Sequence, residues 1–308
     1  GKKTYAQNIT TLVKETMVAE GLCEGMTYSF ESPKVFDKLL IPADSKLRQT
    51  VTISNPLGED FSVMRTVSIN GILNSLSTNY NRRNESAGIF EVARVYLPKA
   101  VPVTELPDEI PTLTVGMYGK MDFYDIKGVV EHLMVVLGIG DRAEYTVETE
   151  LPWMHPGRTA AVVIDGVNVG YVGELHPTVA KNYNIGTKVY LAVLNMEELI
   201  KASNMVNVYK PLPKYPAITR DIAMLVKEDV TVKQIADEIR KNGGEYLEEV
   251  KLFDVYQGEQ IEKGYKSVAY SISFRSAERT LADADVADSM QAILDGLAKE
   301  LGAQLRDK

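Results

Sequence analysis

The sequence lacks most of what disulfide-bonded, metal-binding and membrane-spanning proteins require. Its only cysteine is Cys23, which excludes an internal disulfide and a cysteine-rich metal cage. The three histidines, His132, His155 and His176, are too scattered for a zinc site. No apolar run approaches the roughly 20 residues that span a bilayer, and the opening residues GKKTYAQN contain no signal-peptide core. These absences predict a cytoplasmic protein with no bound metal.

An excess of positive charge is also missing. The formal net charge is −8, whereas sequence-independent binding to nucleic acid depends on many phosphate-neutralising Lys and Arg side chains. The hydrophobic content of 45% and the charged content of 25% are typical of a globular protein. Any nucleic-acid contact would therefore have to be a local site rather than a general affinity.

At 308 residues the chain is long enough for two domains. The stretch VYKPLPKYPAITRD (208–221) has three prolines within six residues, which favours an extended connector. We therefore predict one domain over residues 1–206 and a second over residues 207–308.

Irregular alternation of helical and strand patterns in the first domain indicates an α+β fold with an antiparallel sheet. Asp165-Gly166 lies between two strand-like runs and gives the strongest hairpin signal in the chain. We expect helices at 4–21, 32–40, 63–83, 123–139 and 177–183, and strands at 26–30, 88–98, 112–119, 160–164, 167–175 and 188–196.

The second domain follows the order strand, helix, strand, strand, helix, strand, which is the ferredoxin-like βαββαβ order. Its second helix is expected to begin with Asp283 as the N-cap. Alternation directs one set of apolar side chains toward the helices: Ile222, Met224, Val226, Phe253, Val255, Val268, Tyr270, Ile272 and Phe274. The opposite face, which we call the open face, is expected to carry Ala223, Asp254, Tyr256, Ser267, Ala269, Ser271, Ser273 and Arg275, with Leu252 beside Asp254.

Several long motifs occur in order along the chain: NPLGEDFSVMRT (55–66), HPGRTA (155–160), GYVGELHP (170–177), LFDVYQG (252–258) and SFRSAERTL (273–281). Together they resemble the C-terminal part of the β subunit of bacterial phenylalanyl-tRNA synthetases. The resemblance implies a class II synthetase-like core in the first domain and a ferredoxin-fold anticodon-binding domain in the second. The chain looks like a fragment of such a subunit, without the family's N-terminal modules.

In that family the α subunit uses ATP and Mg²⁺ to make phenylalanyl-adenylate and to charge tRNA-Phe, and the β core packs on it in an (αβ)₂ heterotetramer. The resemblance therefore implies a ligase component that has no catalytic residue and no cofactor of its own. The sequence agrees, because the strand GIFEVARVY (88–96) carries Glu91 without the usual arginine before it, and no glycine-rich segment ending in arginine follows to help clamp ATP phosphates. Arg82 and Arg83 lie nearby in sequence, and we do not expect them to bind a nucleotide.

The resemblance also implies that the open face binds the anticodon of tRNA-Phe, with contacts at Ala223, Asp254 and Ser267. A carboxylate can accept hydrogen bonds from the N1–H and N2 amino groups of guanine, and Tyr256 offers a stacking surface. Lys266, Arg275 and Arg279 could neutralise phosphates. Because residues 207–308 contain 15 Lys and Arg against 18 Asp and Glu, we expect weak RNA affinity from this domain alone.

Other interpretations of these residues compete with the functional ones. Asp254 could be an ordinary surface carboxylate, Tyr256 could simply cover its neighbours, and Arg275 could form an ion pair, as we expect for Arg279. The His-Pro pairs at 155–156 and 176–177 are more typical of rigid turns than of catalysis. For the second domain as a whole, the alternative is a small-molecule regulatory module of the ACT type. For the first, it is an independent class II-like enzyme.

Overall fold

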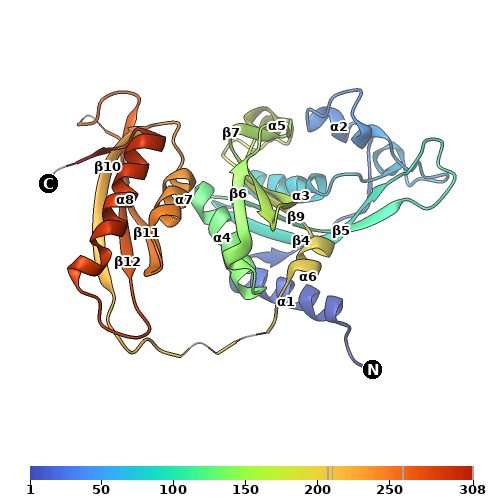
Figure 1. The fold of residues 1–308 in the computed structure, drawn as a ribbon. Helices are drawn as coiled ribbons and strands as arrows, with labels where there is room; N and C mark the ends of the chain where they lie inside the picture. Colours follow the sequence, from blue (N-terminus) through green and yellow to red (C-terminus); the bar gives the residue numbers. More distant parts are fainter. Residues whose placement is uncertain (207, 210, 259, 307–308) are drawn as a thin grey trace. The chain divides into compact units, whose positions relative to one another are not determined.

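The computed structural model describes residues 1–206, 208–209, 211–258 and 260–306 (Figure 1). The chain divides into two compact units, Gly1–Asn207 (unit 1) and Val208–Lys308 (unit 2). Each unit has its own hydrophobic core and is described by itself. Within the described ranges, no helix has the length and apolarity needed to cross a membrane.

Unit 1 is built on a seven-stranded sheet in which one pair of neighbours, β1 and β4, is parallel and the others are antiparallel. In sheet order the strands are β1 (Cys23–Glu24), β4 (Ala87–Leu97), β5 (Asp108–Tyr118), β9 (Tyr190–Asn195), β8 (Val167–Leu175), β7 (Met154–Ile164) and β6 (Ala143–Val147). The predicted α+β fold with a mainly antiparallel sheet is confirmed.

Helices cover both faces of this sheet, as Figure 1 shows. One face packs against α1 (Tyr5–Ala19), α4 (Phe123–Val136) and α6 (Met196–Ala202). The other packs against α2 (Val35–Lys38), α3 (Ile69–Asn81) and α5 (Pro177–Asn182). Each face has its own hydrophobic core, so the sheet is the middle layer of a three-layer unit.

Local sequence signals explain several of these boundaries. Thr4 and Gln7 form a capping box at the start of α1, so side chains satisfy backbone N–H groups there. Asp165 and Gly166 both adopt positive φ, +49° and +80°, which gives the tight turn predicted between β7 and β8. Helix α3 approaches Thr27 so closely at Gly71 that an added Cβ there would be 2.2 Å from Thr27 Oγ1. This explains a glycine inside the helix.

Several sequence-based expectations for unit 1 were wrong. Of the strand expected at 26–30 only Phe30 is in a strand, since β2 spans Phe30–Glu31. The helix expected at 63–83 begins only at Ile69, because Val63–Met64 (β3) pairs with Phe30–Glu31 (β2) in a separate two-stranded sheet. Strand β6 and helix α6 were not expected at all. Strand β6 comes after α4 and helix α6 after β9, and both of these earlier elements have stronger sequence patterns. The pairing of β6 with β7 also depends on contacts between residues distant in sequence.

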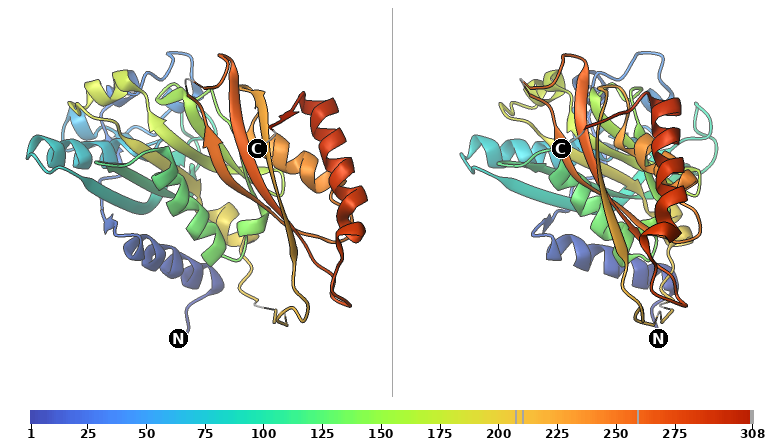
Figure 2. Two further views of the ribbon diagram at one scale, coloured as in Figure 1. Left: turned by 90° about the vertical axis from the view of Figure 1, so that its left-hand side faces the viewer. Right: turned by 60° about the vertical axis from the view of Figure 1, so that its left-hand side comes forward.

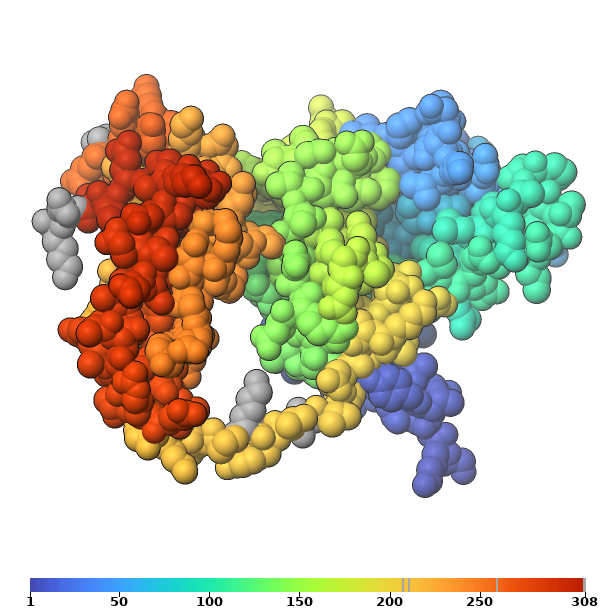
Figure 3. Space-filling model, viewed as in Figure 1, coloured from blue at the N-terminus to red at the C-terminus, as the bar shows by residue number. Residues whose placement is uncertain are grey.

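Unit 2 has the predicted ferredoxin-like order. Its elements are β10 (Ile218–Lys227), α7 (Val232–Asn242), β11 (Leu247–Tyr256), β12 (Tyr265–Phe274), α8 (Asp283–Leu301) and β13 (Gln304–Leu305). The strands lie in the order β11-β12-β10-β13, and both helices pack on the same side of the sheet (Figure 2). In the space-filling view, α7 and α8 form much of the near surface of this unit (Figure 3).

The start of α8 differs from expectation by one residue. Ala282, not Asp283, is the N-cap, and Asp283 is the first residue of the helix. The Asp285 carboxylate accepts the Ala282 N–H at 2.7 Å and pairs with both terminal nitrogens of Arg279. Arg279 therefore has the structural role we expected for it.

Candidate nucleic-acid interface

The open face of unit 2 is organised around small side chains on the central strand β12. For each of these small residues, the strand register places one residue of β10 on one side and one residue of β11 on the other. The three rows are Asp221–Ser271–Lys251, Ala223–Ala269–Asp254 and Leu225–Ser267–Tyr256. Flanking side chains thus border a shallow strip of alanine and serine, which would let a flat ring approach the sheet.

Strand β11 carries two irregularities, between Leu247 and Glu249 and between Leu252 and Asp254. At the second, Phe253 is an extra residue with no partner on β12, which is a β-bulge. Leu252 is therefore opposite Tyr270 on the helix-covered side, and not beside Asp254 as predicted. Phe253 is not buried under the helices either, since its side chain is 55% exposed.

Four of the predicted contact residues lie together on the open face. Ala223 and Asp254 share one row, and Ser267 and Tyr256 share the next. Tyr256 is 41% exposed, and its ring lies against Gly258, where an added Cβ would be 2.3 Å from the phenol oxygen. A glycine at 258 therefore leaves room for this position of the aromatic ring beside the strip.

Lys266 and Arg275, like Arg279, bind to groups of their own chain and are therefore less available to phosphates. Lys266 is opposite Val226, so it belongs to the helix-covered side of β12, and its Nζ donates to the Glu228 carbonyl at 3.0 Å. The Arg275 Nε donates to both Glu248 oxygens at 2.8 and 2.9 Å, and its Nη1 donates to the Tyr215 carbonyl. The structure thus does not bring Lys266 to the open face, and the donors of Arg275 are bound to Glu248 and to the Tyr215 carbonyl.

Another cation, which the sequence analysis did not single out, does lie on this face. The backbone N–H of Arg306 donates to the Ala223 carbonyl at 3.0 Å, which extends the pairing of β13 with β10 by one residue. Its Nη1 donates to Ser267 Oγ at 3.3 Å. The side chain therefore crosses β10 on the open face, and Ser267 and Ala269 are each only 6% exposed.

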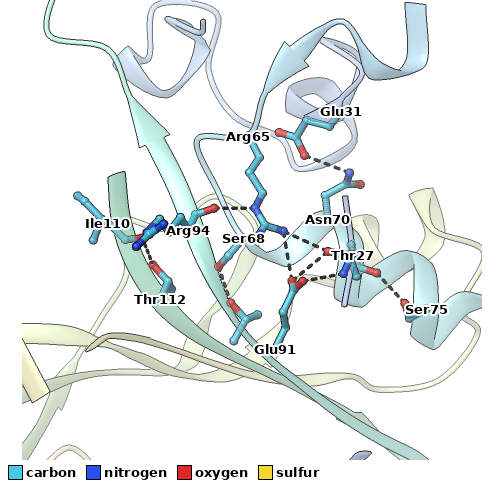
Figure 4. Close-up of polar contacts among 12 residues, drawn as sticks. Thr27, Glu31, Arg65, Ser68, Asn70, Ser75, Glu91, Arg94, Ile110 and Thr112 are labelled. Atoms are coloured by element: carbon cyan, nitrogen blue, oxygen red, sulfur yellow. Dashed lines mark hydrogen bonds and ion pairs between the residues drawn. The ribbon is translucent and has the colours of Figure 1, made fainter. Parts of the chain in front are cut away.

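A buried polar cluster lies in unit 1 between β4, α3 and the segment that precedes β2 (Figure 4). The side chains of Arg65 and Glu91 are 3% and 5% exposed and pair at 3.2 Å. Thr27 donates to Glu91 through its backbone N–H at 2.7 Å and through its hydroxyl at 2.9 Å. Arg65 also donates to the Arg94 carbonyl at 2.8 Å.

Glu91, the acidic residue of the strand that would correspond to a nucleotide site, is thus bonded on both oxygens by its own chain. Arg82 and Arg83 are exposed at the end of α3. This arrangement holds the segments at 27 and 65 against β4.

Glu31 lies beside this cluster and is also buried. Asn70 Nδ2 donates to one of its oxygens at 3.1 Å, while the other oxygen has no hydrogen-bond partner among the residues that the structure describes. Burial raises the pKa of Glu31 from 4.5 to about 7, against the opposing effects of the Asn70 hydrogen bond and the Arg65 charge. Burial likewise raises the pKa of Tyr183, whose hydroxyl donates to Asn70 Oδ1 at 2.8 Å.

The histidines of the two His-Pro pairs have local roles. The His155 Nδ1 accepts the Gly157 N–H, and the His176 Nδ1 accepts the Thr178 N–H at the start of α5. Across the described part of the chain, no group of three or more His, Cys, Asp or Glu side chains is arranged to hold a metal ion.

Comparisons with known proteins agree with this geometry. Residues 1–196 match the family described as phenylalanyl tRNA synthetase beta chain CLM domain, and residues 213–306 match the ferredoxin-fold anticodon binding domain. These two matches define the class of protein: a domain of the tRNA synthetase beta chain type followed by a domain of the ferredoxin-fold anticodon binding type. More particularly, the chain belongs to the phenylalanyl-tRNA synthetase beta chain family.

Curated relatives support the same assignment. The chain is 47% identical over 304 residues to the phenylalanine–tRNA ligase beta subunit of Clostridium tetani and 43% identical over 304 residues to that of Clostridium acetobutylicum. It is 38% identical over 319 residues to the subunit of Symbiobacterium thermophilum. Each match covers 99% of this chain but only 38%, 38% and 35% of the respective relative, so the chain spans little more than a third of their length.

Proposed function

We propose that this chain acts as the C-terminal part of a phenylalanine–tRNA ligase β subunit. In this proposal, unit 2 binds the anticodon loop of tRNA-Phe on its open face, and unit 1 packs against the catalytic α subunit in an (αβ)₂ assembly. ATP and Mg²⁺ would be used by the α subunit, and the present chain would be inactive in adenylate formation by itself. We propose that the chain is located in the cytoplasm.

The observation that carries the RNA-binding proposal is the row Ala223–Ala269–Asp254. Two alanines leave space for a base on the sheet, and the carboxylate at the end of the row can accept hydrogen bonds from the donor edge of guanine. Tyr256 in the adjacent row is exposed enough to stack on a neighbouring base. An ACT-type regulatory role has no comparable support, since residues 213–306 match an anticodon-binding domain.

We expect the full chain to bind an anticodon stem–loop with the sequence GAA more tightly than a loop with a changed first base. Asp254→Asn should weaken binding of the GAA loop about tenfold or more, because a hydrogen bond to a charged group contributes about 1.5–3 kcal/mol. Binding of the altered loop should change little. Fluorescence anisotropy of labelled stem–loops at low salt would measure both affinities.

Glu249→Gln is the matched control, since Glu249 lies on the same strand and face, opposite Ser273. Both substitutions remove one negative charge, so a purely electrostatic effect would strengthen binding equally in the two variants. Equal behaviour of Asp254→Asn and Glu249→Gln would therefore exclude Asp254 as a base-reading residue. NMR shifts confined to other surfaces of unit 2 would show that the open face is not the RNA site.

Support for the α-subunit contact comes from exposed apolar side chains on unit 1. Met26, Leu57 and Tyr28 are 93%, 80% and 68% exposed. The Tyr28 ring packs edge-on against Phe61, which ends the short 3-10 helix Glu59–Phe61 just after Leu57. Large apolar side chains that remain this exposed are candidates for burial at a protein–protein interface.

We expect the chain to copurify with a tagged phenylalanine–tRNA ligase α subunit, and Leu57→Asp to reduce the recovered amount because a charge would be buried at the interface. The chain alone should form no phenylalanyl-adenylate in a pyrophosphate-exchange assay. An exposed control, Val147→Asp on β6, should leave copurification unchanged. Adenylate formation by the isolated chain would refute the proposal that it depends on the α subunit for catalysis.

A further inference from the structure

The far end of the row that contains Asp254 is occupied by Arg306. Because β13 pairs with β10 and the Arg306 N–H binds the Ala223 carbonyl, the row reads Asp254–Ala269–Ala223–Arg306 across four strands. Neighbouring strands lie about 4.8 Å apart, so the backbones at the two ends are roughly 14 Å apart. A carboxylate and a guanidinium thus stand on opposite sides of the same pair of alanines.

The guanidinium of Arg306 is held only weakly by the described part of the chain. Within the described residues its side chain makes a single hydrogen bond, to Ser267 Oγ at 3.3 Å, although an arginine side chain has five N–H donors. Among the described residues, no carboxylate forms an ion pair with it. By contrast, Arg220, Arg275 and Arg279 of the same unit pair with Asp283, Glu248 and Asp285 at 2.6–2.8 Å.

The position of this side chain is nevertheless specific. It lies over Ser267 and beside Ala223, two of the small residues at which a base would approach the sheet. An incoming base would have to move the guanidinium from Ser267, at the cost of one long, neutral-acceptor hydrogen bond. That bond is long and its acceptor is uncharged, so it is weaker than a bond between the guanidinium and a charged phosphate oxygen.

We propose that Arg306 is a phosphate-binding residue of the open face. In the free chain its side chain covers Ser267, and when an RNA loop binds it moves to a phosphate of the nucleotide on the alanine pair. Asp254 would then hold the base and Arg306 the backbone of the same nucleotide. This inference rests on the proposed RNA-binding function and adds to it a residue outside the originally predicted contact set.

Binding of the GAA stem–loop and the altered loop to the full chain, measured across a salt series, tests this assignment. Arg306→Ala should weaken binding of both loops by a similar factor, about two- to tenfold. The slope of log affinity against log salt should fall by about 0.7, the value for one phosphate contact on a single strand. Arg306→Lys should keep the slope, because it keeps the charge.

The matched control is Arg240→Ala, which removes the same charge from α7 on the helix-covered side, and both affinity and slope should stay as in the wild type. Arg306→Ala keeps the backbone bond to Ala223, so β13 does not depend on the deleted atoms. Unchanged or tighter binding by Arg306→Ala would overturn the inference, as would a loss limited to the GAA loop with an unchanged slope. If the wild-type chain binds neither loop, the proposed function fails together with this inference; if only Arg306→Ala is without effect, this inference alone fails.

Discussion

Replacing Arg65 with methionine is expected to lower the free energy of unfolding of unit 1 by about 3–5 kcal/mol. The substitution leaves the Glu91 carboxylate buried without a counter-charge, and it removes the donor that binds the Arg94 carbonyl. Trp153 is the only tryptophan and lies buried in unit 1, so its fluorescence during urea unfolding follows this unit. Unit 2 does not contribute to that signal.

Arg94→Met provides the comparison, because Arg94 and Glu109 form an exposed pair at 3.5 Å and should contribute less than about 1 kcal/mol. A double variant, Arg65→Met with Glu91→Gln, should recover at least about 1 kcal/mol relative to Arg65→Met, since the uncompensated charge is then gone. Equal losses for Arg65→Met and Arg94→Met, or no recovery in the double variant, would show that the buried pair is not what stabilises this region.

The second large effect concerns the pH dependence of stability. The pKa of Glu31 is about 7 in the folded chain against 4.5 for an unperturbed glutamate, so the folded state binds the proton more tightly than the unfolded state. This contribution to the free energy of unfolding is fully present below about pH 4.5. It is lost as the pH rises through about 7, by about 3 kcal/mol in total.

Glu31→Gln keeps an acceptor for the Asn70 amide but cannot ionise. We therefore expect the variant to be more stable than the wild type by up to about 3 kcal/mol near pH 8 and nearly equal to it near pH 4. Urea titrations of Trp153 fluorescence at the two pH values would measure the difference. Glu109→Gln, an exposed carboxylate, should show no such divergence, and a constant difference for Glu31→Gln at both pH values would contradict the assignment.

Much of the fold follows from local patterns. The order of elements in unit 2, the turn at Asp165-Gly166 and the apolar face of α4 depend on residues close in sequence, so alternation and helical periodicity were sufficient to predict them. Prediction from local patterns fails at Val63–Met64. These residues fit a helical pattern, but pairing with Phe30–Glu31 places them in a strand.

The open face was predicted in part for the same reason. Strict alternation placed Asp254 and Tyr256 correctly because both follow the bulge, whereas Leu252, which precedes it, was assigned to the wrong side. Arg306 and the buried pair of Arg65 and Glu91 could not be anticipated. Their partners lie 39 and 26 residues away in sequence, and no local pattern marks them as neighbours.

The bulge at Phe253 also affects how copies of the chain behave toward one another. Strand β11 has no neighbour on its outer edge among the described strands of unit 2, and it exposes Leu252, Phe253 and Val255 there. A long, regular and apolar edge of this kind would be a template for intermolecular strand pairing and aggregation. The two bulges interrupt its hydrogen-bonding pattern and increase its twist. The irregularity that inverts the face of Leu252 therefore also protects an exposed edge from self-association.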